Sequence, residues 1–194
     1  QPDPFKRYKH REVTPLPQPR PPWADFWELC LSDPPPVRSR EENISAADMS
    51  AIMLMSAGIT ARTSAGAGGL GLRAPASAGA LYPAELYAAA CGVEDLEDGL
   101  YHFDPEGPGL HQLWPGKLAQ AAAKRLGTQP GLLTFFVTAM YWRSLWKYRQ
   151  RAYRYCLLDA GHMLANLELA AAACGLAPRL TADFADASLG VFLG

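Results

Sequence analysis

Stretches with regularly placed apolar residues predict two principal helices. Ser45-Ala-Ala-Asp48 has the pattern of a capping box, and the apolar positions after it lead to Gly58, so we expect a helix between them. The longest helix is expected over residues 153–174, where several leucines and a methionine fall on roughly one side and Gly175 marks the end. Two shorter helices are predicted over residues 23–31 and 115–126.

Apolar runs predict the strands. Residues 132–140, rich in Leu, Phe and Val, form the clearest strand, and residues 85–91 are expected to form a second, buried one. Residues 99–104 and 109–114 flank a turn with proline and glycine and therefore predict a hairpin. A final short strand is expected over residues 179–184. Because helices and strands interleave without βαβ repeats, we predict an α+β fold whose mixed, mainly antiparallel sheet is flanked by helices.

Residues 1–36 differ in composition from the rest of the chain. The first 24 residues carry many of the prolines and little apolar pattern, which predicts an extended arm lying on a partner subunit or on its own domain. With the short helix after it, this segment is expected to precede one domain over residues 37–194. A loop rich in glycine and alanine, residues 61–80, lies within that domain.

Composition and charge narrow the function classes. The 194 residues suffice for one domain with a core, and a formal net charge of −1 gives no reason to expect nucleic acid or a membrane as partner. No apolar run approaches the ~20 residues that span a bilayer, and the N-terminus is not signal-like. The four cysteines are scattered without a C-x-x-C pair, which argues against a zinc ribbon or a disulfide scaffold and fits a reducing cytoplasm.

The loop over residues 73–83 is a candidate anion site. Its backbone amides around residues 77–79 and a serine hydroxyl can hold a phosphate or carbonyl oxygens, and Arg73 adds positive charge. A flexible linker whose glycine serves only a turn explains the same composition. A second cationic cluster, Arg38-Ser39-Arg40, suits a phosphate or a carbonyl oxygen, or is a solvated surface cluster.

A basic, aromatic block covers residues 141–155 and contains no acidic residue. Together with the loop it suits a planar, phosphate-bearing cofactor. Lys147 and Tyr148 can form an acid–base pair, since neighbouring cations disfavour a charged lysine and favour a phenolate, so both pKa values can move toward neutrality. Binding of single-stranded nucleic acid and burial at an oligomer interface are the alternatives for this block.

Asp159, His162 and Asn166 share one face of the longest predicted helix. Three weak ligands without a fourth make a poor metal site, so we expect no metal and a partly buried histidine with a satisfied hydrogen bond. Cys91 and Cys174 are interpreted as small core residues.

Four segments carry a resemblance to a known family. They are residues 74–83, the Gly-Leu-Tyr-His-Phe-Asp run at 99–104, residues 146–155 with Lys147-Tyr148, and Asp159-Ala-Gly-His162, in that order. With the proline-rich arm, they make the chain similar to the nitroreductase superfamily, specifically to its SagB/ThcOx-type branch of FMN-dependent dehydrogenases. The resemblance spans nearly the whole chain and is most specific at the Lys-Tyr block.

The resemblance implies a cytoplasmic homodimer with FMN at the subunit interface. Lys147 and Tyr148 correspond to the pair implicated in azoline oxidation, where a base removes a ring proton while hydride passes to the flavin. A backbone N–H near Ala182 or Asp183 would address flavin N5. The residues expected to bind the cofactor are Arg38, Ser39, Arg40, Arg73, Pro75, Ser77, Ala78, Gly79, Arg151, Ala182 and Asp183.

Three departures from the family pattern bear on this expectation. Ala76 stands where the family usually has serine, which removes one hydroxyl from the cofactor loop. Arg149 replaces the usual glycine after Lys-Tyr, so the local turn and access to the pair differ. The sequence ends at Gly194, ahead of the final strand and extension that supply further phosphate contacts in relatives, so we expect less complete flavin binding or a longer natural chain.

The sequence therefore predicts an FMN-dependent oxidoreductase that dehydrogenates azoline-type heterocycles in modified peptides, or a related small substrate. The alternative within enzymes is an NAD(P)H-dependent nitro- or quinone reductase, which needs an open face over the flavin and no specific base. The alternative from another class is a non-catalytic, peptide-binding scaffold of the same fold.

Overall fold

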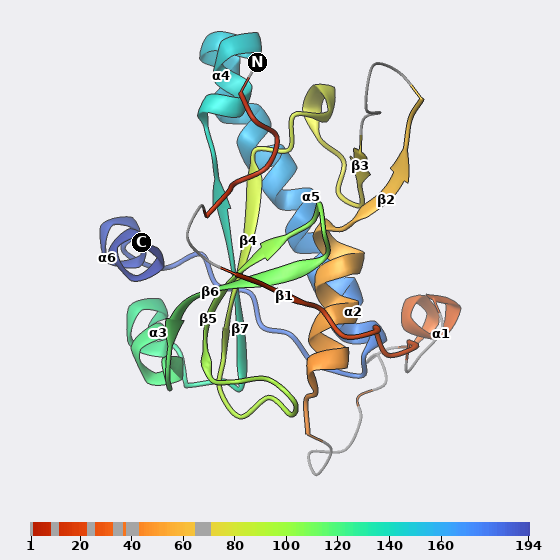
Figure 1. The fold of residues 1–194 in the computed structure, drawn as a ribbon, viewed down its shortest axis with the longest axis vertical. Helices are drawn as coiled ribbons and strands as arrows, with labels where there is room; N and C mark the ends of the chain where they lie inside the picture. Colours follow the sequence, from red (N-terminus) through yellow and green to blue (C-terminus); the bar gives the residue numbers. More distant parts are fainter. Residues whose placement is uncertain (1, 9–11, 23–25, 33–36, 38–42, 65–70) are drawn as a thin grey trace.

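The computed structural model describes residues 2–8, 12–22, 26–32, 37, 43–64 and 71–194. A central antiparallel sheet carries helices on both faces (Figure 1). Its five strands lie in the order β1-β6-β5-β4-β7, so β4 and β5 are interior strands and β1 and β7 are edges. The strands are β1 (Val13–Pro15), β4 (Ala84–Ala90), β5 (Gly99–Asp104), β6 (Gly109–Pro115) and β7 (Leu133–Ala139).

The first face of the sheet is covered by α2 (Ala46–Ala57) and α5 (Ala152–Ala173). Met49, Ile52 and Met53 of α2 are fully buried there against Leu86 of β4 and Phe103 of β5. Each such side chain contributes about 2 kcal/mol through burial. This larger core fixes the position of α5, whose N-terminal end reaches the candidate site.

The second face is covered by α3 (Ala119–Leu126) and α6 (Asp186–Leu193). Leu189 and Phe192 of α6 pack with Leu126 of α3 over the alternate residues of β4 and β7, among them Phe136. Because β4 has neighbours on both sides and helices on both faces, all seven of its residues are buried. Its small alanines allow both layers to approach closely.

The elements whose signals come from neighbouring residues are present as the sequence predicts. The capping box of α2 is present in full: the Ser45 hydroxyl accepts from the Asp48 N–H, and the Asp48 carboxylate accepts from the Ser45 N–H. The hairpin β5–β6 has the expected bounds. Gly127 ends α3 in the left-handed conformation, with φ of 61°. The α+β class with an antiparallel sheet is therefore confirmed.

The strand expected over residues 179–184 is wrong. This segment pairs with no described strand, and most of it is exposed. Leu180, Ala182 and Phe184 alternate with polar residues as they would in a strand, but such a pattern does not supply a strand to pair with. The segment instead leads into α6, which the sequence did not predict. Further elements not predicted are α4 (Trp142–Tyr148), β2 (Ile59–Arg62), β3 (Gly71–Arg73) and the short 3₁₀ turns η1 (Ala78–Ala80) and η2 (Arg149–Arg151).

The proline-rich arm lies on its own domain. β1 pairs antiparallel with β6, and residues 2–8 start beside α4 and lead away from it toward the sheet (Figure 1). Here Tyr8 packs its ring 5.2 Å from that of His102 and 5.3 Å from that of His111. The short helix α1 (Phe26–Leu31) overlaps the one predicted over residues 23–31. None of the described helices has the length and apolarity that crossing a membrane requires.

Candidate active site

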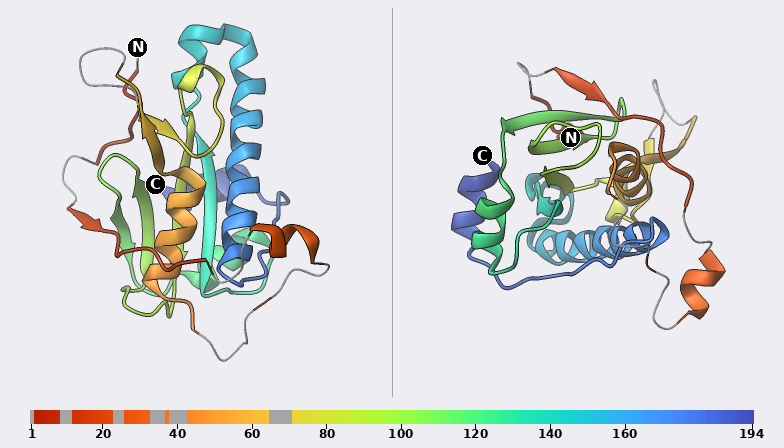
Figure 2. Two further views of the ribbon diagram at one scale, coloured as in Figure 1. Left: turned by 90° about the vertical axis from the view of Figure 1, so that its right-hand side faces the viewer. Right: turned by 90° about the horizontal axis from the view of Figure 1, so that it is seen from below.

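The predicted anion loop and the Lys-Tyr pair meet at one end of the molecule. A Cβ atom at Gly79 would lie 2.5 Å from Lys147 Nζ and 2.5 Å from Tyr148 Oη, so both polar groups converge on this glycine. Figure 2, in its left view, shows η1 beside α4 and the adjacent end of α5. Gly79 and Lys147 are both exposed, so the meeting point is open to a ligand. The structure thus brings together the two segments that the sequence analysis had assigned jointly to a planar, phosphate-bearing cofactor.

The loop has an unusual backbone. Gly79 has φ of 65°, and two residues with side chains, Ala80 and Tyr82, have φ of 53° and 45°. A left-handed conformation costs about 1–2 kcal/mol for each residue other than glycine. Such strain persists only where surrounding contacts hold it, and it is often found at functional sites.

Asp159 of α5 holds the loop. Its carboxylate accepts a 2.6 Å hydrogen bond from the Ser77 hydroxyl and a 3.2 Å bond from the Ala78 N–H. The Ser77 hydroxyl oxygen also accepts from the Tyr82 N–H at 2.9 Å, which closes the loop on itself. Asp159 is only 5% exposed. Two donors that the sequence analysis assigned to a cofactor are therefore engaged within the chain.

Arg73 is directed toward the arm. Its side chain is buried and donates to the Pro4 carbonyl at 2.7 Å, while its guanidinium stacks 5.1 Å from the Tyr82 ring. Burial lowers the pKa of Arg73, against the opposing charge of Glu85. Its backbone N–H donates to the Tyr82 hydroxyl at 3.0 Å. Arg73 thus joins the loop to the arm, and its guanidinium is withdrawn from the exposed side of the loop.

Arg143 anchors α4, the helix that carries the Lys-Tyr pair. It is 3% exposed and donates to the Tyr82 carbonyl at 3.0 Å, to the Asp3 carbonyl at 3.0 Å and to the Glu85 carboxylate. Glu85 also binds His102 Nε2 at 2.7 Å. Burial alone would raise the pKa of Glu85, but the His102 hydrogen bond and the Arg143 charge together lower it. Loop, arm and α4 therefore share one buried ionic anchor.

The Lys-Tyr pair sits at the C-terminal end of α4. Lys147 Nζ lies 5.4 Å from the centre of the Tyr148 ring, and this ring packs 4.5 Å from that of Tyr155 in α5. Arg149 then adopts φ of 50° and ψ of −127°, a conformation that favours glycine. Arg149 therefore makes this turn at the cost of backbone strain.

Of the other predicted site residues, Arg38, Ser39 and Arg40 lie outside the described residues. Ala182 and Asp183 are exposed in the segment between α5 and α6, where the Asp183 N–H donates to Thr181 Oγ1 at 3.4 Å.

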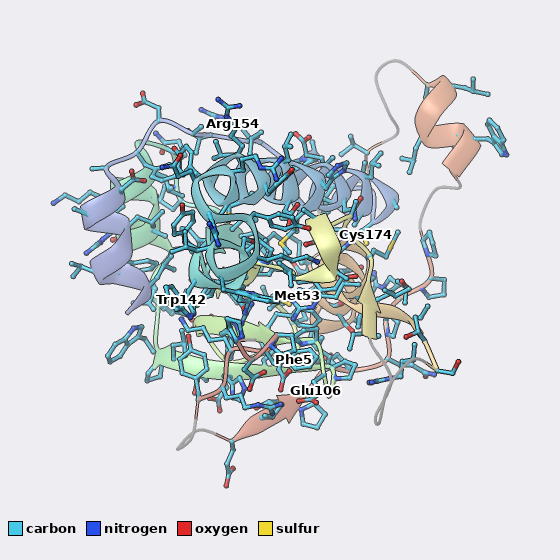
Figure 3. All side chains as sticks on the ribbon, turned by 90° about the horizontal axis from the view of Figure 1, so that it is seen from above. Phe5, Met53, Glu106, Trp142, Arg154 and Cys174 are labelled. Carbon is cyan, nitrogen blue, oxygen red and sulfur yellow. The ribbon has the colours of Figure 1, made fainter. Side chains whose placement is uncertain are left out.

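Of the remaining loop positions, Pro75 is buried and Ala76 exposed. Arg151 is exposed in η2, shortly after the Lys-Tyr pair. Figure 3 looks down on this end and shows Trp142 on α4 and Arg154 on the outward side of α5.

The histidine of the Asp-Ala-Gly-His segment differs from expectation. His162 is exposed, so the prediction of a partly buried side chain is wrong. Positions three apart on a helix differ by only about 60° in direction, so both residues lie on the same side of α5, with Asp159 inside the buried stripe and His162 beyond its edge. Within the described part of the chain, no three His, Cys, Asp or Glu side chains are grouped so as to hold a metal ion.

Sequence analysis missed the residues that assemble the site. It placed Arg143 in a basic, aromatic block and gave Asp159 and Glu85 no role at the loop. The one indirect signal was Glu85 at the start of an apolar strand, because a buried carboxylate needs a partner. Asp159 gave no such signal, because α5 also contains polar and charged residues that face water.

Comparisons with known proteins identify relatives of the chain. No protein-family model matches it. It is 30% identical over 120 residues to a nitroreductase-like protein of Methanocaldococcus jannaschii, covering 60% of this chain and 61% of that protein. It is 31% identical over 121 residues to the microcin B17-processing protein McbC of Escherichia coli, covering 57% of this chain and 44% of McbC. It is also 31% identical over 116 residues to the trifolitoxin-processing protein TfxB of Rhizobium leguminosarum, 54% of this chain and 30% of TfxB.

Solved structures share the fold. A nitroreductase-like protein from Anabaena variabilis superimposes with a TM-score of 0.79 at 32% identity, covering all of this chain and 37% of that one. A chain of the E. coli microcin synthetase McbBCD complex, with truncated pro-MccB17 bound, superimposes with a TM-score of 0.67 at 22% identity, over 79% of this chain and 59% of that one. The nitroreductase fold is thereby confirmed, as are nitroreductase-like and peptide-processing homologues. The chain spans 61% or less of the length of the curated relatives it matches.

Proposed function

We propose that this homologue of the nitroreductases and of two peptide-processing proteins is an FMN-dependent oxidoreductase that dehydrogenates azoline-type heterocycles in modified peptides. The observation that carries the proposal is the convergence of Lys147 Nζ and Tyr148 Oη on Gly79 of the loop. Two proton-transferring groups are thereby concentrated at an exposed point beside a loop without bulky side chains. The match to McbC and TfxB supports a peptide as substrate.

The residues present fit a flavin in part. A Cβ at position 79 would collide with Lys147 Nζ and Tyr148 Oη, each 2.5 Å away, so glycine allows the pair to pack against the loop backbone. The exposed Arg149 and Arg151 supply positive charge for a phosphate. Ser77 and Ala78 contribute by shaping the loop, because their donors are engaged by Asp159. We retain Arg38, Ser39, Arg40, Pro75, Ala182 and Asp183 as proposed cofactor contacts and Arg73 as an indirect one.

The chemistry of the chain's own residues is proton transfer. When bound, FMN accepts the hydride equivalent that leaves the azoline ring. Lys147 and Tyr148 hold and remove the proton from the neighbouring ring carbon, one of them in its deprotonated form, so that the ring loses two hydrogens and becomes aromatic. A positioned general base of this kind contributes roughly 10²- to 10⁴-fold in rate.

We further propose a homodimer with the cofactor at the interface. α5 exposes large apolar side chains along its outward side, with Leu157, Leu158 and Leu169 exposed to 57%, 61% and 50%. Several such side chains on one helix of a water-facing surface favour burial against another chain. A second copy covering α5 would lie next to the loop and to Tyr153, which is 63% exposed.

Two other functions remain as proposals of lower standing. A nitro- or quinone reductase acting with NAD(P)H needs no positioned base, which leaves the convergence at Gly79 without a purpose. A non-catalytic scaffold is favoured by one observation: two loop donors expected to hold FMN are engaged by Asp159.

The test uses purified protein, FMN and a peptide with a single thiazoline. Flavin absorbance near roughly 370 and 450 nm, with FMN released on denaturation, is expected of the wild type. Lys147→Ala and Tyr148→Phe should each lower thiazoline oxidation by about 100-fold or more while FMN stays bound, because each removes a proton-transferring group.

The matched control for Lys147 is Lys124→Ala in α3, whose side chain is exposed and which belongs to the helix layer on the second face of the sheet. This variant should oxidise the peptide at the wild-type rate. Normal turnover by the Lys147 and Tyr148 variants would refute the catalytic assignment, whereas a colourless protein unable to bind added FMN would favour the scaffold.

A further inference from the structure

We infer that Asp159 is a positioning residue, which holds the loop over residues 73–83 in the conformation that presents Gly79 to Lys147 and Tyr148. The inference rests on the proposed function, because it gives Asp159 a role in the same reaction. Asp159 touches neither of the two reacting side chains in the described contacts; it acts through Ser77 and Ala78.

The first argument is that the two hydrogen bonds from the loop to Asp159, here called the clamp, tie the loop to a helix packed in the core. Asp159 lies 82 residues from Ser77 and belongs to α5, which is packed into the larger core through Met163 and Leu167. A helix fixed in this way gives the carboxylate a defined position relative to the sheet. The loop is thus tied to the most rigid part of the molecule, one turn of helix beyond Tyr155, whose ring packs on Tyr148. One helix therefore supports both halves of the candidate site.

The second argument is the strain in the loop. Ala80 and Tyr82 hold left-handed backbone conformations that side chains rarely adopt. The Ser77 hydroxyl, itself fixed by Asp159, receives the Tyr82 N–H and so ties the strained residues into a closed turn. Without the carboxylate, the Ser77 hydroxyl is free to rotate and the turn loses its fixed end. The relaxed loop then withdraws Gly79 from the Lys-Tyr pair.

The third argument is the burial of the carboxylate. An ionised group that is 5% exposed needs hydrogen-bond donors, and the described donors to Asp159 are those of Ser77 and Ala78. Yielding these donors to an incoming phosphate would leave a buried charge unpaired, which is costly. Asp159 therefore keeps them when a cofactor binds, and the clamp is a permanent part of the site.

The chain offers a matched control. Asp48 is also a buried carboxylate that accepts from a serine hydroxyl and a backbone N–H, those of Ser45, each at 2.9 Å. It stands at the N-terminal end of α2, at the opposite end of the molecule from η1 (Figure 1). Asp48→Ala removes the same two kinds of hydrogen bond, together with an ion pair to the half-exposed Arg20 at 3.5 Å, without touching the loop.

The experiment compares Asp159→Ala with Asp48→Ala by hydrogen exchange and NMR on protein without added flavin. In Asp159→Ala, exchange of the Ala78 and Tyr82 amides should accelerate by about 10- to 100-fold, as expected for lost hydrogen bonds to a charged group. The side-chain signals of Lys147 and Tyr148 should shift. Asp48→Ala should change neither.

With flavin and the thiazoline peptide, Asp159→Ala should lower kcat by about 10- to 100-fold, because misplacement by about 1 Å has an effect of this size. Asp159→Asn keeps one acceptor oxygen and should recover part of the loss. If Asp159→Ala does not fold, Ser77→Ala removes the hydroxyl that joins Asp159 to the Tyr82 N–H. Exchange of the Tyr82 amide should then accelerate, with a smaller change at Ala78, whose N–H keeps its bond to Asp159.

Three results would overturn the inference: unchanged amide protection, unchanged Lys147 and Tyr148 signals despite a loosened loop, or tighter FMN binding by Asp159→Ala. The last would mean that the carboxylate competes with the cofactor. If the wild type binds no flavin, the proposed function fails, while the exchange and NMR measurements still decide whether Asp159 positions the loop.

Discussion

The two ends of the molecule use the same interaction in different ways. At the end where α2 begins, Ser45 and Asp48 are 3 residues apart, and the carboxylate accepts both the hydroxyl and the N–H of Ser45. At the candidate site, Ser77 and Asp159 are 82 residues apart, and the carboxylate accepts the Ser77 hydroxyl and the Ala78 N–H. The first pair sets the start of a helix; the second holds a strained loop against another helix.

The difference concerns what each pair stabilises. The α2 cap adds to a conformation that its residues already favour, so local and global preferences agree. The loop clamp holds Ala80 and Tyr82 in conformations that they disfavour. The Asp48 end therefore stabilises the fold, whereas the Asp159 end holds a strained conformation at the candidate site. Four substitutions, at Arg143, Asp48, Asp159 and Arg149, test this contrast.

The largest effect is expected from Arg143→Met, which removes the ionic anchor of the site end. Glu85 would then remain buried beside His102 without its guanidinium partner, and leaving one member of a buried pair costs about 3–5 kcal/mol. The free energy of unfolding from urea titration measures this. Arg154→Met, on the outward side of α5, should change it by less than about 0.5 kcal/mol. Equal effects of the two variants would show that the site end has no such anchor.

The same anchor predicts a pH dependence. Burial raises the pKa of Glu85, but His102 and Arg143 lower it by more, so the folded value lies below the ordinary value of 4.5. A lowered folded pKa stabilises the protein above 4.5, and this contribution is lost as the pH falls below it. The stability of the wild type should therefore fall with pH in this range. Arg143→Met should show a weaker fall.

An effect of intermediate size is expected when the stabilities of Asp48→Ala and Asp159→Ala are compared. Asp48→Ala should cost about 2 kcal/mol, because a helix cap and hydrogen bonds to a charged group are lost together. Asp159→Ala loses similar bonds but frees the loop, and relief of about 1–2 kcal/mol of left-handed strain per residue offsets part of the loss. We expect the Asp159 variant to be the more stable of the two in urea titration. The reverse order would mean that the loop stores no strain.

The smallest effect is expected from Arg149→Gly. Because Arg149 has φ of 50° and ψ of −127°, glycine should stabilise the protein by about 1 kcal/mol. Arg149→Ala controls for loss of the charge and should give no such gain, since alanine shares the steric restriction. A gain of equal size in both variants would assign the effect to charge and not to the backbone.

The sequence predicted those features whose interacting residues are close together along the chain. The α2 cap and the β5–β6 hairpin involve neighbours in the chain, and their residue types reveal them directly. The nitroreductase fold followed from resemblance and is confirmed. Residues 179–184 were misassigned because a strand exists only where another strand pairs with it, and propensity does not report this.

The candidate site was predictable in its parts and not in its assembly. The loop and the Lys-Tyr pair were singled out, but Arg143 was grouped with the other cations of the basic, aromatic block, and Asp159 was considered only beside His162. Both are buried, and both act on residues far away along the chain. A charged residue gives the same signal in the sequence whether it faces water or a buried partner, so only the fold tells them apart.

The N-terminal arm is held on the domain by hydrogen bonds to its main chain. Arg143 and Arg73 donate to the carbonyl oxygens of Asp3 and Pro4. Every amino acid offers a carbonyl oxygen, so mutations at these two positions leave both acceptors in place as long as the backbone keeps its course. The outward side chains of the arm, and the surface that they present, can therefore change in evolution while the hydrogen bonds from Arg73 and Arg143 are kept.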